Sequence, residues 1–178
     1  MKTALSISLS FLFTACSQNA ADTPTLNSVQ SDIVQALPDV PHISRAVLAQ
    51  WQESRLDRVL ILDTRPMSEY AVSHIYGALQ VDPKTAPSVL LSRFDVTGKD
   101  VVLYCSVGWR SSLLGDASRQ ALLAAGAKSV SNLEGGLFGW HNDGRALMDA
   151  SGLTMAVHPY DKKWGQLIKN TEAIRYTP

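Results

Sequence analysis

Short apolar runs that end in polar residues are the feature that most constrains the fold of this 178-residue chain. Val59–Leu62 and Val101–Tyr104 are continuous and rich in branched side chains, a pattern typical of strands buried on both faces of a parallel sheet. Two further short strands are expected, at Ala78–Val81 and Ser129–Leu133. Helical segments alternate with these runs, over Arg45–Glu53, Met67–Ser73, Ala86–Phe94, Ser111–Ala125 and Leu137–Asn142. We therefore expect an α/β fold, with a parallel sheet of about five strands and helices on both faces.

The alternating pattern occupies one unit, and both ends of the chain differ from it. The unit is expected to span residues 41–148 as one domain. Residues 16–40 are expected to be a flexible tether, because their first half is polar and without periodicity. Within this tether Asp32–Leu37 is predicted to form at most one helical turn. Residues 149–178 form an extension that is expected to be partly helical, with one helix at Lys162–Lys169 packing back on the domain.

The first residues have the composition of a secretory leader. A single charge at Lys2 precedes an uncharged apolar stretch over residues 5–15, which is too short to span a bilayer stably. The end of this stretch resembles a bacterial lipobox. We therefore expect residues 1–15 to be a lipoprotein-type signal peptide and Cys16 to carry the lipid. Cleavage by ordinary signal peptidase a few residues later and an uncleaved apolar anchor are the alternatives.

This leader predicts a protein of the cell envelope that faces the periplasm. A lipid on Cys16 is then its only attachment to the membrane. Ser17, which follows Cys16, resembles the residue found in lipoproteins sorted to the outer membrane, so we expect the outer rather than the inner membrane.

Charge and histidine spacing exclude several classes of function. The formal net charge is zero, with 16 basic and 16 acidic residues, so the basic excess typical of nucleic-acid-binding proteins is missing. His42, His141 and His158 have no metal-ligand spacing with one another or with a cysteine pair. We expect no nucleic acid partner, no metal and no cofactor.

The chain has two cysteines, Cys16 and Cys105. If Cys16 is lipidated, its sulfur is a thioether, and Cys105 is then a lone thiol outside the cytoplasm, where unpaired thiols tend to oxidise. A buried and inert cysteine at the end of a strand is the simplest interpretation. The residues that follow Cys105 favour a reactive one.

The sequence around Cys105 predicts a strand, a tight loop and the start of a helix. Ligands bind at the carboxyl ends of strands in an open parallel sheet, and the N–H groups of the loop and the helix N-terminus form an anion site there. The same field favours the thiolate of the cysteine. Gly108 lets the backbone turn, and Arg110 adds a positive charge suited to an oxyanion. The candidate catalytic residues are Cys105 and Arg110, and the candidate substrate-binding residues are Ser106, Val107, Gly108, Trp109 and Ser111.

Two chemistries fit such a loop, namely phosphate-ester hydrolysis through a phosphocysteine and sulfur transfer through a cysteine persulfide. Cysteine phosphatases resemble Cys-x5-Arg, because phosphate with its oxygens needs a wide cradle. Here the spacing from Cys105 to Arg110 is one residue shorter. The six-residue loop favours a single outer sulfur atom.

Four segments of the chain resemble the rhodanese-like family, in the family's order. The loop Cys105-Ser106-Val107-Gly108-Trp109-Arg110-Ser111 resembles its active-site loop Cys-x-x-Gly-x-Arg-Ser. Upstream, Leu62–Arg65 and Glu69–Ala78 resemble an Asp-Val-Arg segment and a Glu-Tyr followed by Gly-His-Ile-Pro-Gly-Ala. Downstream, Asn132–Gly136 with Trp140 and Gly144 resembles the family's ending. The resemblance covers about residues 56–147.

This resemblance implies a rhodanese-like fold and a single-domain sulfurtransferase. Cys105 is then expected to take a sulfane sulfur from a small sulfur-containing anion such as thiosulfate and to pass it to cyanide or a thiol. Thr64, Ser73 and Tyr76 depart from the family pattern, but at scaffold positions. Two other classes stay open. One is a cysteine-dependent phosphatase or arsenate reductase, and the other is a non-enzymatic sulfur carrier or docking module for an envelope protein.

Residues outside the loop have two interpretations each. Asp63 and Arg65 follow the first core strand, where they either orient substrate at the pocket or form a buried ion pair that fixes the loops, and we favour the ion pair. His74 is expected in a structural turn rather than as a base for Cys105. Glu134 is expected to brace a loop. The tail aromatics Tyr160, Trp164 and Tyr176 are expected to be packing residues rather than a binding patch.

Overall fold

The structure, a computed structural model, describes residues 24–178. The expected signal peptide, the lipidation site Cys16 and the first part of the tether lie outside the described residues. Within the described part, no helix is both long enough and apolar enough to cross a membrane.

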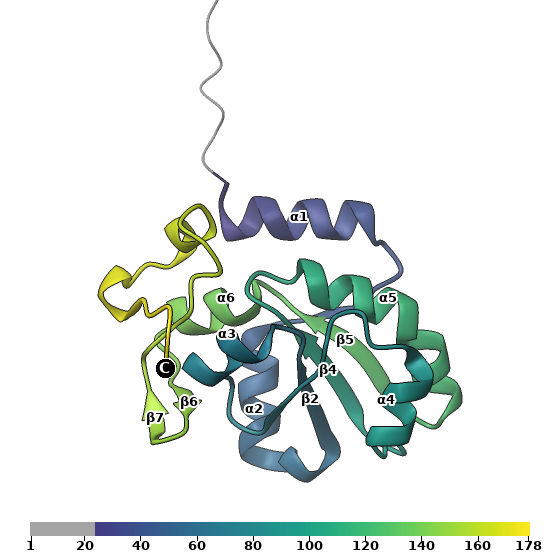
Figure 1. Cartoon of the computed structure of the whole chain (residues 1–178). Coiled ribbons are helices and arrows are strands. Elements are labelled where there is room, and N and C mark those ends of the chain that lie inside the picture. Colours follow the sequence, from purple (N-terminus) through teal and green to yellow (C-terminus); the bar gives the residue numbers. More distant parts are fainter. Residues whose placement is uncertain (1–23) are drawn as a thin grey trace, which may run out of the picture.

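A parallel sheet of five strands forms the centre of the molecule (Figure 1). Its strands are β1 (His42–Ile43), β2 (Val59–Asp63), β3 (Ala78–Gln80), β4 (Asp100–Tyr104) and β5 (Ser129–Leu133), in the spatial order β1-β5-β4-β2-β3. All neighbouring pairs are parallel, and Leu62 and Asp63 of β2 lie beside Leu103 and Tyr104 of β4. β4 is therefore the central strand, and the chain leaves its carboxyl end at Cys105. The expected α/β fold with a parallel sheet is confirmed.

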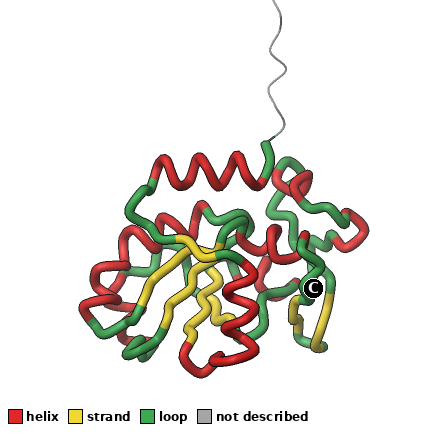
Figure 2. Tube along the Cα trace, turned by 180° about the vertical axis from the view of Figure 1, so that it is seen from behind, coloured by secondary structure: helices red, strands yellow, loops and turns green. Residues whose placement is uncertain are grey.

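Helices cover the sheet from both sides, as the tube in Figure 2 also shows from behind. They are α1 (Leu26–Ala36), α2 (Arg45–Arg55), α3 (Met67–Val72), α4 (Pro87–Arg93), α5 (Trp109–Ala124) and α6 (Gly136–Asn142), with a short 3-10 turn η1 (Leu56–Arg58) after α2. The five helices expected from periodicity are present, and their ends differ from the predictions by two residues or fewer. α5 begins at Trp109 rather than Ser111, which places Arg110 in its first turn.

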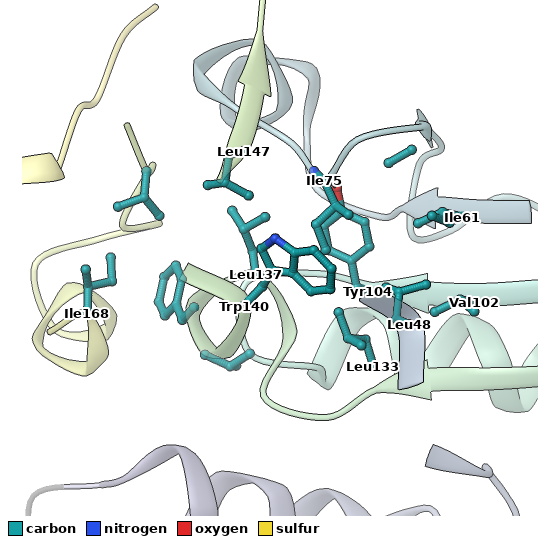
Figure 3. Packing of buried hydrophobic residues seen from close by; sticks show 14 of the residues in the cluster. Leu48, Ile61, Ile75, Val102, Tyr104, Leu133, Leu137, Trp140, Leu147 and Ile168 are labelled. Carbon is teal, nitrogen blue, oxygen red and sulfur yellow. Dashed lines mark hydrogen bonds between the residues drawn. The ribbon is translucent and has the colours of Figure 1, made fainter. Parts of the chain in front are cut away.

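Alternating side chains of the strands give the molecule two apolar cores, one on each face of the sheet. On the first face, Ile61, Val102 and Tyr104 pack with Leu48 of α2 and Leu137 of α6 (Figure 3). On the opposite face, the side chains of β2 and β4 that lie between these residues pack with α4 and α5. These are Leu60, Leu62, Val101 and Leu103, with Leu90 from α4 and Leu114 and Leu122 from α5. The period of two along each strand explains this division, and it explains why the strands are apolar without interruption.

The prediction of a flexible tether over residues 16–40 is wrong in its described part. α1 begins at a capping box, in which the Ser28 amide donates to Thr25 Oγ1 (3.0 Å) and the Thr25 amide donates to Ser28 Oγ (2.9 Å). Val29 and Ile33, four residues apart, are buried in the first core. Two apolar side chains are a weak signal in the sequence, and the helix is stabilised by what they pack against.

Five further elements were missed or assigned the wrong type. β1 has only two residues, directly after Pro41, and it is a strand because it pairs with β5. A hairpin of β6 (Leu147–Asp149) and β7 (Gly152–Thr154) opens the C-terminal extension. The predicted helix at Lys162–Lys169 is a short 3-10 helix, η2 (Trp164–Leu167), and another, η3 (Thr171–Ala173), follows it. The extension does pack back on the domain, since Ile168 and Ala173 are buried in the first core.

Candidate active site

Cys105 lies directly after the central strand, at the carboxyl edge of the sheet. Its side chain is almost fully buried and forms part of the wall of a pocket of about 200 Å³. The chain turns through residues 105–108 and enters α5 at Trp109. Gly108 makes this turn with a φ of 109°, in the left-handed region where a side chain is costly. Its amide donates a hydrogen bond to Cys105 Sγ (3.2 Å), so the loop curls back on the sulfur.

The outer side of this loop is fixed by the start of α6. The amides of Leu137 and Phe138 donate to the carbonyls of Cys105 (2.8 Å) and Ser106 (2.9 Å). Gly136 lies against the same carbonyls, and a Cβ there would come within 2.8 Å of the Ser106 oxygen. In a trans peptide the N–H points opposite to the C=O, so the amides of Ser106 and Val107 point away from α6. Hydrogen bonds from α6 to its carbonyl groups hold the loop in place, so the amides of Ser106 and Val107 are not used to fix it.

The N-terminus of α5 adds further unpaired donors beside the loop. The first bond that closes the helix runs from the Ser112 amide to the Gly108 carbonyl (3.0 Å), and Ser111 Oγ donates to the same oxygen (3.1 Å). The amides of Trp109, Arg110 and Ser111 come earlier and have no acceptor within the helix. Together with the aligned peptide dipoles they create a positive field that stabilises an anion at this end of α5.

Arg110 and Glu69 form a two-pronged ion pair beside the pocket. Arg110 Nη1 donates to Glu69 Oε1 (2.9 Å), and Nη2 donates to Oε2 (3.1 Å). Ser106 joins the pair, since its Oγ accepts from Arg110 Nη2 (2.9 Å) and donates to Glu69 Oε2 (3.1 Å). Burial opposes the charge of the guanidinium, but the Glu69 hydrogen bonds and the neighbouring Cys105 outweigh it and raise the pKa of Arg110. Arg110 is thus a charged group whose partner is already present.

Aromatic side chains form most of the remaining pocket wall. Val107 and Trp109 come from the loop and α5, while Tyr160 and Trp164 come from the C-terminal extension. The Tyr160 ring centroid lies 4.9 Å from the Arg110 guanidinium carbon. Trp164 packs against the first core, as expected of the tail aromatics, and it also lines the pocket together with Tyr160. Tyr176 does not line the pocket and packs edge-on against His158.

Asp63 and Arg65 form a second ion pair, which is completely buried and does not line the pocket. Arg65 Nη2 donates to Asp63 Oδ2 and to the Ser73 carbonyl, both at 2.6 Å, and the Arg65 amide donates to Asp63 Oδ1 (3.0 Å). Burial would lower the pKa of Arg65, but the Asp63 carboxylate outweighs it and holds that pKa above its usual value. This pair fixes the β2–α3 segment, as the structural interpretation expects.

Other residues considered in the sequence have structural positions. His74 stacks on Tyr70 with 3.9 Å between ring centroids, and its Nδ1 is bonded to the Tyr70 carbonyl (3.1 Å). The Glu134 carbonyl accepts from Arg45 Nη1 (3.0 Å) at the start of α6. Burial lowers the pKa of His158, so this ring near the pocket is uncharged at neutral pH. Residues 24–178 contain no group of three or more potential metal ligands.

Of the predicted loop residues, the structure places Cys105, Ser106, Val107, Trp109 and Arg110 on the pocket wall, with Gly108 bonded to the sulfur and Ser111 buried behind the loop. Sequence reasoning missed Glu69, Gly136, Tyr160 and Trp164. Glu69 stands in a recognised motif, so its pairing with the loop arginine could have been suspected. No pattern in the sequence predicts that Tyr160 and Trp164 line the pocket.

The chain is similar to proteins of known family and structure. A family model described as the rhodanese-like domain matches residues 46–143. No curated protein matches the chain. Among solved structures, the chain is similar to the polysulfide-sulfur transferase homodimer of Wolinella succinogenes, with 21% identity and a TM-score of 0.52, over 70% of this chain and 90% of that one.

Two further solved structures have similar scores. The thiosulfate sulfurtransferase of Pseudomonas aeruginosa is 22% identical with a TM-score of 0.51, over 76% of this chain and 26% of that longer one. The rhodanese-like domain of an Anabaena protein is 27% identical with a TM-score of 0.50, over 61% of this chain and 79% of that one. These likenesses show a common fold.

Proposed function

The chain belongs to the rhodanese-like domain family, and from this premise we propose that it is a sulfurtransferase that carries a sulfane sulfur on Cys105 as a persulfide. The observation that carries the proposal is the cysteine at the end of the central strand with the Gly108 amide directed at its sulfur (3.2 Å). The loop from this cysteine to the arginine at the start of α5 has only six residues, with both ends included. Such a loop can hold one additional sulfur atom.

The first half-reaction is a displacement at sulfur. The Cys105 thiolate attacks the outer sulfur of a donor such as thiosulfate, the sulfur–sulfur bond of the donor breaks, and sulfite leaves with the electron pair. The persulfide anion then lies beside the Gly108 amide and the unpaired amides of α5, which stabilise its negative charge. Arg110 holds Ser106 and Glu69 in place at the rim of the pocket.

The second half-reaction returns the enzyme to its starting state. A nucleophilic acceptor, cyanide or a thiol, attacks the outer sulfur of the persulfide, and the Cys105 thiolate leaves. This step balances without a metal or a cofactor. Two of the similar structures are sulfur transferases, one for polysulfide and one for thiosulfate, and they support this class of reaction for the present chain.

The test is the intact mass of the protein after incubation with thiosulfate and, in a parallel sample, with the benzenethiosulfonate anion. Wild-type protein should gain the mass of one sulfur atom and lose it again when cyanide is added. Cys105→Ser should gain nothing. Leu113→Ser, an exposed position on α5, serves as the matched control and should behave like wild type. Equal masses for wild type and Cys105→Ser with both donors would show that the proposal is wrong.

The alternative of a cysteine-dependent phosphatase or arsenate reductase fits the pocket less well. The loop is one residue shorter than the phosphatase spacing, and a phosphate dianion would meet the Glu69 carboxylate that already occupies Arg110. Turnover of an aryl phosphate without any persulfide would favour that alternative. A persulfide that forms but is not discharged by cyanide or thiols would favour a non-enzymatic carrier or docking module for an envelope protein.

We also propose that the protein is an envelope lipoprotein that faces the periplasm and is anchored through Cys16. The support is the leader sequence alone, with its single charge, its short apolar stretch and its lipobox-like end. Fractionation of cells that express wild type and Cys16→Ala tests this. Wild type should be found in the membrane fraction and Cys16→Ala should not, and equal membrane association of both would contradict the anchor.

A further inference from the structure

The wall of the pocket opposite the loop belongs to the C-terminal extension. Tyr160 and Trp164 line the pocket with Val107 and Trp109, although 49 residues of chain lie between Arg110 and Tyr160. Apart from Arg110 and the reacting Cys105, the described residues that line the pocket are uncharged. A substrate that reaches Cys105 therefore passes beside aromatic rings, whose faces favour apolar or polarisable groups.

The extension holds Tyr160 in this position against a local conformational preference. Tyr160 has a φ of 66° and is the one non-glycine residue with positive φ in the part of the chain that the structure describes. Large side chains rarely adopt this conformation, which persists only when surrounding contacts impose it. The Tyr160 amide donates to His158 Nδ1 (3.0 Å), and the Trp164 amide donates to Asp161 Oδ1 (2.8 Å).

Contacts on either side anchor this segment to the domain. The Val157 amide donates to the Ala173 carbonyl (3.0 Å), and Val157, Ile168 and Ala173 are buried in the first core. The Asn142 side-chain amide of α6 donates to the Leu167 carbonyl (2.7 Å). The aromatic wall is therefore a fixed part of the pocket, and Tyr160 lies over Arg110 because the extension is folded there.

The charge in the pocket is suited to a weakly charged substrate. Both terminal nitrogens of Arg110 donate to Glu69 or Ser106, and the Glu69 side chain is only 4% exposed. The ion pair is neutral as a whole, and the Tyr160 ring lies against its guanidinium group. A dianion such as thiosulfate therefore finds no uncompensated positive side chain here.

We propose that this pocket selects sulfur donors in which the sulfane sulfur is attached to an apolar organic group and which carry at most one negative charge, such as aromatic thiosulfonates and organic persulfides, over thiosulfate. The proposal rests on the proposed sulfur transfer through Cys105 and specifies its substrate class. Tyr160 and Trp164 are the specificity-determining residues, and Glu69 disfavours dianions.

The reaction with an aromatic thiosulfonate balances without any other reactant. The Cys105 thiolate forms a bond to the outer sulfur of benzenethiosulfonate, the sulfur–sulfur bond of the donor breaks, and benzenesulfinate leaves with the electron pair. Cys105 becomes a persulfide anion, as it does with thiosulfate. Methanethiosulfonate reacts in the same way with the same charge, so the two donors differ only in their apolar group.

The experiment compares the rates at which benzenethiosulfonate and methanethiosulfonate convert Cys105 to the persulfide in the full-length protein. Each rate is divided by the rate of the same donor with free cysteine, which removes the difference in intrinsic reactivity. Wild type should prefer the aromatic donor by about tenfold, the scale of a well-formed aromatic contact with burial of the ring. Thiosulfate should be the slowest donor after the same correction.

Tyr160→Asn tests the wall directly, because asparagine tolerates positive φ and removes only the ring. We expect it to reduce the aromatic preference about three- to fivefold. Trp164→Leu, which keeps an apolar side chain, should reduce the preference in the same direction. Tyr76→Asn is the matched control, since Tyr76 is about as exposed as Tyr160 and does not line the pocket. It should keep the wild-type preference.

The outcomes separate this proposal from the proposed function. If no donor adds sulfur to Cys105, the sulfur-transfer function itself is wrong. If a persulfide forms but wild type shows no aromatic preference, or if Tyr160→Asn and Trp164→Leu both retain it, the function stands and the substrate class is wrong. A loss of preference in Tyr76→Asn equal to that in Tyr160→Asn would also overturn the assignment of the wall.

Discussion

The Asp63–Arg65 pair and the Glu69–Arg110 pair consist of the same two chemical groups in different surroundings. Both side chains of the first pair are 0% exposed, and its arginine also donates to the Ser73 carbonyl. In the second pair Glu69 is buried but the Arg110 side chain is 23% exposed and lines the pocket. The Asp63–Arg65 pair, which is sealed from solvent, fixes the chain around it. The Glu69–Arg110 pair, which has one side open to the pocket, can also affect a ligand. These are the sealed pair and the pocket pair.

The difference arises from how the two pairs are formed along the chain. Asp63 and Arg65 are two residues apart, so a single turn after β2 brings them together, and the sheet and α3 then cover them. Glu69 and Arg110 lie on different helices, 41 residues apart in the sequence, and only the tertiary fold brings them together. Four predictions test whether the first pair determines stability and the second determines chemistry.

The largest effect is expected from breaking the sealed pair. Arg65→Met leaves the Asp63 carboxylate buried without its partner, which should lower the free energy of unfolding by about 3–5 kcal/mol. Urea unfolding followed by circular dichroism measures the change. In Arg110→Met the remaining partner lies beside an open pocket, so the free energy of unfolding should fall clearly less than in Arg65→Met. Equal losses in the two variants would contradict the division between the pairs.

Breaking the pocket pair should affect the reaction more than the fold. Arg110→Met leaves the Glu69 carboxylate without its ion-pair partner at the rim of the pocket that holds the anionic sulfur, and we expect the rate of persulfide formation to fall about 100-fold. Rapid quenching followed by intact mass measures this rate. The double variant Glu69→Gln with Arg110→Met should recover part of the loss, because the unpaired carboxylate is gone. A double variant as slow as the single one would show that the arginine acts in another way.

Neutralising the carboxylate of the pocket pair should change the preference for donor charge. Glu69→Gln keeps the size of the side chain and uncovers the charge of Arg110, so the rate with thiosulfate should rise about tenfold relative to the rate with benzenethiosulfonate. The ratio of the two rates is the measured quantity. Glu134→Gln, at a position outside the pocket, is the matched control and should keep the wild-type ratio.

The smallest effect concerns alkaline pH and the sealed pair. Burial and the neighbouring Asp63 raise the pKa of Tyr104 well above that of an unfolded tyrosine. Above the unfolded value the unfolded chain loses this proton while the folded chain keeps it, so the free energy of unfolding falls as the pH rises. The loss from this one group should be about 0.8 kcal/mol at roughly pH 10.5.

Tyr104→Phe removes this loss, although it also removes the acceptor of the Ile75 amide and therefore lowers stability at neutral pH. The comparison is between the slopes of stability against pH above pH 9 in the two proteins. Wild type should have the steeper fall. Identical slopes would show that Tyr104 does not titrate differently in the folded and unfolded states.

Local signals in the sequence were sufficient for most of the sheet. Val59–Leu62 and Val101–Tyr104 are apolar at every position because both faces of β2 and β4 are covered, and this pattern is visible without any structure. The ion pair of Asp63 and Arg65 could also be predicted, because the two residues are only two positions apart in the chain. The loop from Cys105 to Arg110 was also recognisable, because its spacing and its glycine are local properties.

Elements that exist only through tertiary contacts were missed. β1 is a strand because β5 is beside it, and α1 is a helix with only two buried side chains, Val29 and Ile33. Neither has enough local signal to be distinguished from a polar linker, because short segments are unstable in isolation.

The sequence by itself determined the cysteine that we propose as the nucleophile, its loop and the sheet that presents them, because each depends on residues close together in the chain. Only the tertiary structure decided what surrounds the sulfur. It placed Glu69 on Arg110 and folded the C-terminal extension so that Tyr160 and Trp164 close the pocket. These contacts join segments far apart in sequence, and their geometry follows from the packing of the whole domain rather than from any local pattern.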